Sequence, residues 1–537
     1  MVSSGARAAQ ALTEAARATS TSGVGVSELV QAASSYASDP VWANDFITTL
    51  GAGRIAALPL AEAVPNGQQL ANLLGWTLAT ASTIWDEETC NSMATTLAGS
   101  VTDKGHWGRI TALNAILTAP TTATDFGAET ADTGSAEEAD GVSTADAGGG
   151  FAQGFLTALA DALAGIDPSM ISRYRGYANT SYPDLTSFGR QAIGSTLTGY
   201  SFDPLAGALE AIAADPRTAL DYLTETPAST NQPRFQQLSQ RQWDQAGLAA
   251  YTTAIAAATS QRTSTDASTR HQADQLTGQA IDYLATNTTE DQYTTTTETA
   301  IASLLANSPA ETTCAWNQTS PYKSWNTPTC DQDNNWFGHP LTDHEPIDSA
   351  PITTLAWRII DTPGSTSTIA TALAEHAHTQ AQTNLTNTGT DADRRVNAIN
   401  TPYLQANYAI GYLAGLTNNK NNTNTYEHAL TTNGAIDTIQ VSAMAIQDAA
   451  NAGLLDPEDY TITGDSSKTY TWIITKPDGT HTIDLTQADD PTMAPSELGA
   501  WVEMVESGPG DYVFEDITND FGNSYLHGYR SGSAYDG

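Results

Sequence analysis

The dipeptide Asp-Pro recurs along this chain, and its place before Ala-rich runs is the feature that most limits the fold. It occurs at residues 39–40, 167–168, 203–204, 215–216, 456–457 and 490–491. An Asp side chain accepts hydrogen bonds from unpaired N–H groups at a helix N-cap, and Pro fits the first helical position because its missing N–H would have had no partner there. Runs such as DPVWANDFITTL and DPLAGALEAIAADPRTALDYL therefore predict helices.

Apolar residues at helical spacing support the same interpretation. Two stripes have this period: Leu248, Tyr251, Ile255 and Ala258, and then Leu276, Ala280 and Leu284. A further stripe, Leu404, Tyr408, Gly411 and Gly415, contains small residues that would let a neighbouring helix approach closely. We expect each stripe to face a core, so the predicted fold class is mostly α.

One segment, at about residues 459–487, has a different pattern. The runs YTITG, TYTWIIT and THTIDLT alternate apolar and polar residues, and Pro477-Asp478-Gly479 lies between the last two. A Pro-Asp-Gly stretch between β-branched runs is typical of a tight turn. We expect a small antiparallel hairpin or three-stranded meander there, followed by a final helix in APSELGAWVEMVE.

The predicted domain boundaries follow shifts in composition. Residues 121–150 hold seven acidic residues and no basic one, which is typical of a flexible acidic linker or loop. We therefore expect two helical lobes around this linker, the first over residues 1–120 and the second over 151–455. The second lobe would carry an irregular Trp-, Pro- and Asn-rich loop at about 307–350. Residues 456–537 would hold the hairpin and the C-terminal helix.

The net charge excludes some kinds of partner. The 537 residues include 21 Lys and Arg against 60 Asp and Glu, a formal net charge of −39. Such a field repels phosphate backbones, so we expect no nucleic-acid binding, and it disfavours anionic membrane surfaces. No run approaches the ~18 consecutive apolar residues of a membrane span. The acidity is consistent with a self-repelling soluble surface or with capture of a basic partner protein.

The cysteines bear on the compartment. Cys90 lies in an Ala- and Thr-rich helical region, where we expect a small buried side chain. Cys314 and Cys330 bracket the irregular loop, and a disulfide between them would stabilise the fold by about 3 kcal/mol and imply an oxidising compartment. Two free thiols are the alternative. The N-terminal residues lack an apolar h-region, so we expect secretion without a conventional signal peptide, or a cytoplasmic protein.

A metal site is a weaker prediction for the same loop. His339 and His344 follow Cys314 and Cys330, but these two cysteines lack the short C-x2-4-C spacing of zinc sites. In Glu375-His376-Ala377-His378, two imidazoles at i and i+2 would lie on different helix faces. Nucleophile-elbow and phosphate-loop motifs are absent, so the sequence indicates no catalytic residue and no cofactor.

Three tryptophans lie in or beside the Cys-bracketed loop. Trp316, Trp325 and Trp336 could anchor a protein or glycan partner there. Alternatively, they pack the loop onto the helical body.

Several stretches resemble a known family. These are DPVWANDFITTLGAGRIAAL, LLGWTLATAS, the block from DPLAGALEAIAADPRTALDYL to LSQRQWDQAGLAAYTTAIAAAT, and the ending ITNDFGNSYLHGYRSG. Together they resemble a family of large, Ala-rich, mostly helical actinobacterial proteins of unknown function, often found with type VII (WXG-type) secretion proteins. The resemblance implies a helical fold and carries over no catalytic residue.

The chain also departs from the pattern of type VII substrates. Their helical hairpin with a Trp-x-Gly turn is missing, and the only literal match, Trp336-Phe337-Gly338, lies in the irregular loop. A Tyr-x-x-x-Asp/Glu export element fits Tyr512 to Asp516, although about two such matches are expected by chance.

The sequence thus predicts a non-enzymatic scaffold or interaction protein that is exported through, or associated with, type VII secretion. It would have a protein partner, and the sequence does not determine its oligomeric state. The alternative is a metal-assisted hydrolase or secreted toxin that uses Cys314, Cys330, His339 and His344.

Overall fold

The fold is known from a computed structural model that describes most of the helical chain. Described are residues 2–17, 25–61, 64–102, 108–122, 150–166, 197, 199–228, 230–319, 335–337, 339–340, 349–389, 392–421, 441, 444–445, 448–449, 451–453, 461–463, 473–475, 482–484 and 524–535. The chain divides into two compact units. Unit 1 comprises Met1–Thr265 with Gln292–Thr297, and unit 2 comprises Asp266–Asp291 with Glu298–Gly537.

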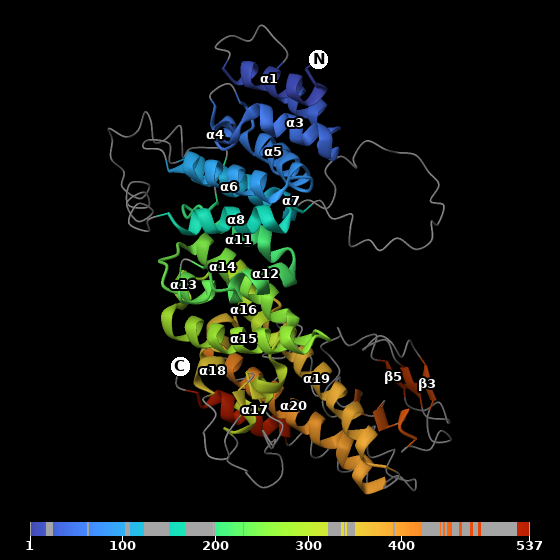
Figure 1. Ribbon diagram of the computed structural model, residues 1–537. Helices are drawn as coiled ribbons and strands as arrows, with labels where there is room; N and C mark the ends of the chain where they lie inside the picture. Colours follow the sequence, from blue (N-terminus) through green and yellow to red (C-terminus); the bar gives the residue numbers. More distant parts are fainter. Residues whose placement is uncertain are drawn as a thin grey trace. The chain divides into compact units, whose positions relative to one another are not determined.

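The described part of unit 1 is built of helices (Figure 1). They are α1 (Ser4–Arg17), α2 (Val26–Ser34), α3 (Pro40–Leu50), α4 (Ala52–Ile55), η1 (Leu58–Leu60), α5 (Gly67–Ser82), α6 (Glu87–Val101), α7 (Gly108–Thr122), α8 (Gln153–Ala164), α11 (Ala206–Ala213), α12 (Pro216–Thr224), α13 (Arg234–Leu238), α14 (Gln245–Thr259) and η5 (Ser260–Thr263).

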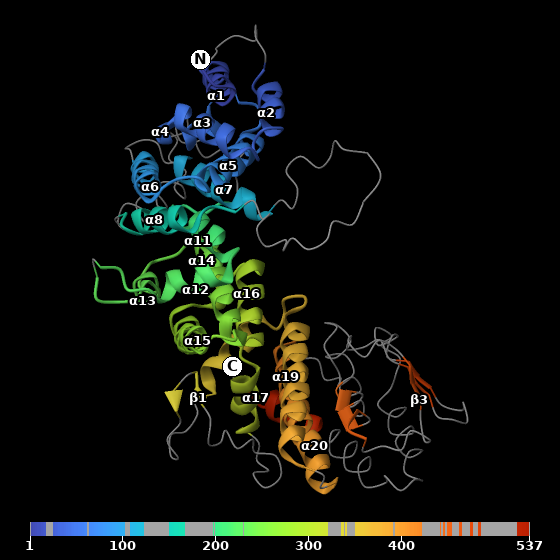
Figure 2. The ribbon, with the colours of Figure 1, turned by 45° about the vertical axis from the view of Figure 1, so that its right-hand side comes forward.

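The helices of unit 1 stack in layers, each packed on the next. One row runs α1, α3, α5, α7, α11, α14, and beside it α4 packs on α6 and α6 on α8. This succession of layers can be followed in Figures 1 and 2. Large side chains between the layers, such as Phe46, Leu74, Ile116 and Tyr251, are completely buried. Burial of that apolar face, rather than helix propensity alone, holds such helices in place.

Two of the Asp-Pro predictions are confirmed. Asp39 caps α3, where its side chain accepts from the N–H groups of Val41 and Trp42. Asp215 caps α12 through the N–H of Arg217. Pro occupies the first helical position in both helices.

The prediction at residues 203–204 is confirmed only in part: Asp203 Oδ1 accepts from the N–H of Leu205 at 3.0 Å, as a capping side chain does, but the helix starts later than expected. The helix α11 begins only at Ala206, and Asp203 is buried at 0% exposure. The guanidinium of Arg241 donates a hydrogen bond to the Asp203 carboxylate, from Nη2 to Oδ1 at 2.9 Å. The sites at 167–168, 456–457 and 490–491 lie outside the described residues.

The boundary between the units does not coincide with the acidic segment 121–150. Helices on both sides of this segment pack together in unit 1, where Asn114 of α7 donates to the carbonyl oxygens of Ser201 and Asp203 at 2.9 and 2.8 Å. The N–H of Gly207 in turn donates to Asn114 Oδ1 at 2.9 Å. Compactness does not test whether a part folds alone, so the predicted domain boundaries stay predictions.

Unit 2 is also mainly helical. Its elements are α15 (Ala267–Asn287), η6 (Glu290–Gln292), α16 (Thr295–Ala306), α17 (Pro309–Asn317), β1 (Asn335–Trp336), β2 (His339–Pro340), α18 (Ala350–Ile359), α19 (Ser365–Asn387), α20 (Ala392–Asn421), β3 (Thr461–Thr463), β4 (Ile473–Thr475) and β5 (Thr482–Asp484), of which η6 and α16 reach into unit 1. The long helices α19 and α20 lie side by side, as both Figure 1 and Figure 2 show. A further helix covers residues 524–533.

The helical stripes predicted from the sequence face the core. Leu248, Tyr251, Ile255 and Ala258 are buried in α14, and Leu276, Ala280 and Leu284 are buried in α15. Tyr408, Gly411 and Gly415 are buried in α20, whereas Leu404 is half-buried. The mostly helical fold class is thereby confirmed.

Short strands occur within residues 459–487. The strands β3, β4 and β5 pair antiparallel in that order, with Ile474 opposite Ile462 and Ile483. Each is three residues long. Residues 477–479 and the expected final helix at 494–506 lie outside the described residues, so the hairpin before a C-terminal helix stays a prediction.

Among the described residues, no helix is both long enough and apolar enough to cross a bilayer.

Candidate functional site

The buried carboxylate of Asp448 is the centre of the most chemically distinctive cluster in unit 2. It accepts from Tyr403 Oη at 2.6 Å and from Gln382 Nε2 at 2.7 Å. His378 Nδ1 lies 2.9 Å from Asp448 Oδ2. A carboxylate oxygen accepts from this nitrogen in the tautomer that carries its proton on Nδ1. Tyr403 Oη is a longer 3.4 Å from the same nitrogen.

The cluster is assembled from three helical segments. His378 and Gln382 are one turn apart on α19, so both point to the same side. Tyr403 comes from α20, and Asp448 from the helical residues that follow it. Arg395 Nη2 donates to the carbonyl oxygen of Ala452 at 2.7 Å and thereby holds that segment a second time.

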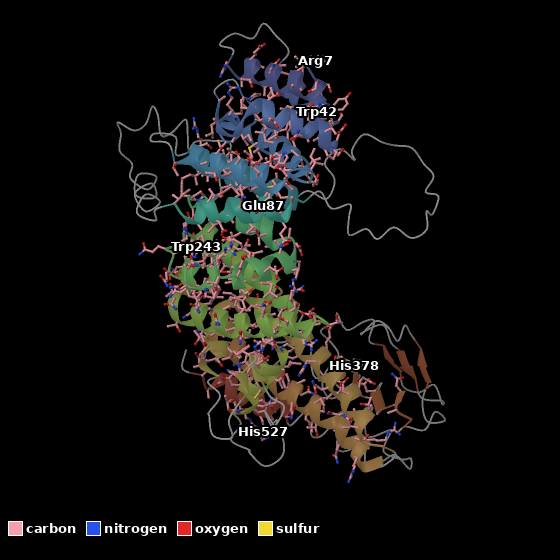
Figure 3. The ribbon with its side chains drawn as sticks, viewed as in Figure 1. Arg7, Trp42, Glu87, Trp243, His378 and His527 are labelled. Atoms are coloured by element: carbon pink, nitrogen blue, oxygen red, sulfur yellow. The ribbon has the colours of Figure 1, made fainter. Side chains whose placement is uncertain are left out.

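The imidazole of His378 differs in exposure from its partner. Its side chain is 47% exposed, whereas that of Asp448 is 0% exposed. The hydrogen bond to Asp448 raises the pKa of His378 above its ordinary value, against an opposing contribution from burial. Figure 3 labels His378 beside the helices of unit 2. An oriented, half-exposed imidazole can accept and release a proton near neutral pH, and it can also simply brace α19 against the residues around Asp448.

Unit 1 contains a charged cluster around the buried guanidinium of Arg234. Arg234 binds Asp161 Oδ1 at 2.6 Å and Glu225 Oε2 at 2.7 Å, and its guanidinium lies 4.7 Å from the ring centroid of Tyr222. Burial raises the pKa of the Tyr222 hydroxyl well above its usual range. These contacts tie α8 to the segment from α12 to α13, and we interpret them as braces between helices.

Trp316, predicted as an anchor for a partner, is a core residue. It lies in α17 at 0% exposure, its ring stacks on Tyr412 at 5.4 Å between centroids, and its Nε1 donates to Thr353 Oγ1 at 3.2 Å. A side chain with no exposed surface cannot contact a partner in this conformation. The alternative, that the residue packs on the helical body, is the one that the structure supports.

The other loop residues are only partly described. Trp336 is half-buried, with its ring edge-on to Phe337 at 5.1 Å. Phe337 is buried against Gly278 of α15, where a Cβ would lie 2.8 Å from Phe337 Cβ. Trp325 and His344 lie outside the described residues, and only the backbone of His339 is described, in β2.

The cysteines differ in state. Cys90 is free and buried in α6, as the sequence predicts. Cys314 takes part in a disulfide. Cys330 lies outside the described residues, so its pairing with Cys314 stays a prediction. A sulfur in a disulfide cannot serve as a thiolate ligand, and within the described ranges no group of His, Cys, Asp and Glu could hold a metal ion.

The Asp448 cluster escaped prediction from the sequence. The sequence indicated only that Glu375-His376-Ala377-His378 is a poor metal motif. The partner of His378 lies 70 residues further along the chain. With 60 carboxylates in the sequence, nothing distinguished Asp448 from the rest. The helical spacing of His378 and Gln382 was the only local signal.

The fold defines a class of mostly helical protein with a layered stack in unit 1 and internally paired polar clusters. The chain belongs to a family of unknown function, DUF6571, which it matches over residues 1–443. No curated protein and no solved structure matches it. The resemblance to a family of unknown function is thus confirmed.

Proposed function

We propose that this protein is a non-enzymatic scaffold that binds another protein. The observation that carries the proposal is the layered packing of unit 1, in which α1, α3, α5, α7 and α11 follow one another as successive layers. Stacks of this kind expose an extended surface composed of many helix ends, and such surfaces typically serve to bind partners.

Charge pairs around buried arginines support the same function. Arg241 binds Asp203, which precedes α11, and Arg234 of α13 binds Asp161 of α8. Both arginines are nearly buried, with side chains 6% and 7% exposed. Groups held in this way stiffen a scaffold, because moving one helix would leave a buried charge unpaired.

We further propose that the protein acts in an actinobacterium and is exported through, or associated with, type VII secretion. The support is the likeness of its Ala-rich segments and of its ending ITNDFGNSYLHGYRSG to the family described above. The disulfide of Cys314 also supports export, because disulfides persist in oxidising compartments. The hairpin at 459–487 would be an accessory element of this scaffold.

A metal-assisted hydrolase remains the alternative, and it would need Cys314, Cys330, His339 and His344, with both cysteines reduced. Zinc analysis of the full chain, purified without added metal, separates the two functions. We expect substoichiometric zinc and no hydrolysis of peptide, ester, glycoside or phosphate substrates above a heat-killed control. Stoichiometric zinc together with turnover would overturn the scaffold proposal.

Export is tested on native material. Intact mass with and without reductant, measured on protein from cells and from their medium, reports both the location and the state of Cys314. We expect the oxidised form in the medium. Reduced protein found only inside the cells would contradict export and leave the scaffold function standing.

A further inference from the structure

Four large apolar side chains are exposed in the described part of the chain, and all belong to unit 1. They are Val2, Tyr36, Val41 and Ile84. Val2 precedes α1, Tyr36 lies between α2 and α3, Val41 opens α3, and Ile84 links α5 to α6. We call this set the apolar edge.

Contacts place all four positions near the first turns of α3, either directly or through a residue close in sequence. The start of α1 packs there, since a Cβ on Gly5 would lie 2.4 Å from the carbonyl oxygen of Trp42. The ring of Tyr36 stacks on Trp42 at 5.9 Å between centroids. From the layer below, Trp85 Nε1 donates to Asn44 Oδ1 at 2.8 Å. Three successive layers therefore contribute to the apolar edge.

The exposure is not that of scattered surface residues. Val41 is 67% exposed and Tyr36 57% exposed, whereas Trp42, which follows Val41 and stacks on Tyr36, is 6% exposed. Single apolar residues on a surface need no explanation, but a group that continues a buried aromatic cluster marks an interaction site. The cluster does continue inward, because the ring of Trp42 stacks on that of Phe46 at 4.9 Å.

Carboxylates border the apolar edge. Asp39 and Asp86 cap α3 and α6, and Glu87 and Glu88 occupy the first turn of α6. All four are exposed. Hydrogen bonds from Thr89 lower the pKa of Asp86, so its charge is retained at neutral pH.

Figure 3 labels Arg7 and Trp42 in the first layers of unit 1 and Glu87 further along the stack. One exposed basic side chain of α1, Arg7, stands against the four exposed carboxylates, so the border as a whole is acidic. That sign favours a basic occupant. A second copy of the chain would instead bring one net charge of −39 against another.

We propose that the apolar edge binds a basic segment of a partner protein. The segment would place apolar side chains on Tyr36, Val41 and Ile84 and Lys or Arg side chains opposite Glu87 and Glu88. This proposal rests on the scaffold function and names the chemistry of the partner. Apolar contact supplies most of the affinity, and the carboxylates supply orientation and a faster encounter.

Peptide binding to the full chain tests the apolar contribution. The probe is a helical peptide of roughly 18 Leu and Lys residues with all leucines on one face, and a scrambled peptide of identical composition and charge is its control. Fluorescence anisotropy should show tighter binding of the amphipathic peptide. The double variant Val41→Ser with Ile84→Ser should weaken it about tenfold, toward the scrambled peptide. The conservative pair Val41→Ile with Ile84→Leu should bind like the wild type.

The charge contribution has a matched control as well. Glu87→Gln with Glu88→Gln should weaken binding severalfold and reduce its salt dependence. Glu14→Gln with Glu28→Gln removes the same charge from exposed positions on α1 and α2 that are not among the four bordering carboxylates, and should change little. Circular dichroism and melting temperature verify that each variant folds, since all these side chains are exposed.

Two results would overturn the proposal. Equal binding by the wild type and the Val41→Ser, Ile84→Ser variant would mean that the peptide binds the acidic surface at large. A wild-type dimer in light scattering, converted to a monomer by that variant, would assign the apolar edge to a second copy. Neither result bears on whether the protein hydrolyses a substrate, so the scaffold function is tested separately.

Discussion

Gly415 of α20 lies directly against the backbone of Tyr529 in the C-terminal helix: a Cβ at Gly415 would be 2.1 Å from the Tyr529 carbonyl oxygen. The contact is reciprocal along both helices. Gly411 meets Tyr525 in the same way, and Gly528 and Gly532 meet Tyr408 and Tyr412. Each helix therefore presents two glycines one turn apart to the other, and the backbones approach as closely as backbones can.

Substitution at this helix pair should be costly. Gly411→Ala adds a methyl group where the Tyr525 carbonyl oxygen would be 2.1 Å away, so the helices must separate. We expect a loss of about 2 kcal/mol in the free energy of unfolding, despite the higher helix propensity of Ala. Gly154→Ala in α8 is the control, because nothing lies within 4 Å of its Cβ. The Gly154→Ala variant should gain up to about 1 kcal/mol in the free energy of unfolding. Equal changes for Gly411→Ala and Gly154→Ala in urea unfolding would contradict the prediction.

The buried pair of Asp203 and Arg241 should contribute far more than an exposed pair. Asp203→Ala leaves a guanidinium whose side chain is 6% exposed without its carboxylate, at an expected cost of about 3–5 kcal/mol. Asp221→Ala removes the partner of Arg217, where the side chains are 51% and 37% exposed, and should cost less than about 0.5 kcal/mol. Chemical denaturation of both variants measures the contrast. A small effect at Asp203 would mean that Arg241 finds another acceptor.

His378 should make stability depend on pH. Its pKa is raised in the folded state, so its contribution is fully present below the pKa of an unfolded His, about 6.5, and is lost as pH rises through the folded value. We expect His378→Gln to lower the melting temperature more at pH 6 than at pH 8. The effect is modest, because the side chain is half-exposed. A pH-independent loss at His378 would leave only a packing role.

Glu210 in α11 should have the opposite role. Burial raises its pKa to about 7, so the folded state binds its proton more tightly than the unfolded state does. Stability therefore falls as pH rises from about 4.3 to about 7, by an amount on the order of 3 kcal/mol. Glu210→Gln should unfold at higher urea concentration than the wild type at pH 8 and at a similar concentration at pH 4.5. Glu88→Gln, at an exposed site, controls for the general effect of removing one charge. Indistinguishable curves for Glu210→Gln and the wild type at pH 8 would contradict the raised pKa.

The candidate site was less predictable than the fold. The prediction that Gly411 and Gly415 admit a close neighbour is correct, because small residues at helical spacing leave a groove whatever fills it. For Trp316 the sequence left two roles open, a partner anchor and a packing residue. The choice between these roles depended on Tyr412 and Thr353, which are distant in sequence. The cluster around Asp448 had no signal of its own, since its members come from segments far apart in the chain.

The sequence by itself determined where several helices begin and which sides of them are buried. Both properties arise within a few residues: Asp39 and Asp215 cap their helices through N–H groups two or three positions away, and the stripe through Tyr251 follows from the helical period. Only the tertiary structure decided that Asp203 pairs with Arg241, that His378 meets Asp448, and that Trp85, the neighbour of Ile84, bonds Asn44 of α3. Those outcomes depend on which helices pack together, and that depends on the burial of whole faces rather than on any local residue pattern.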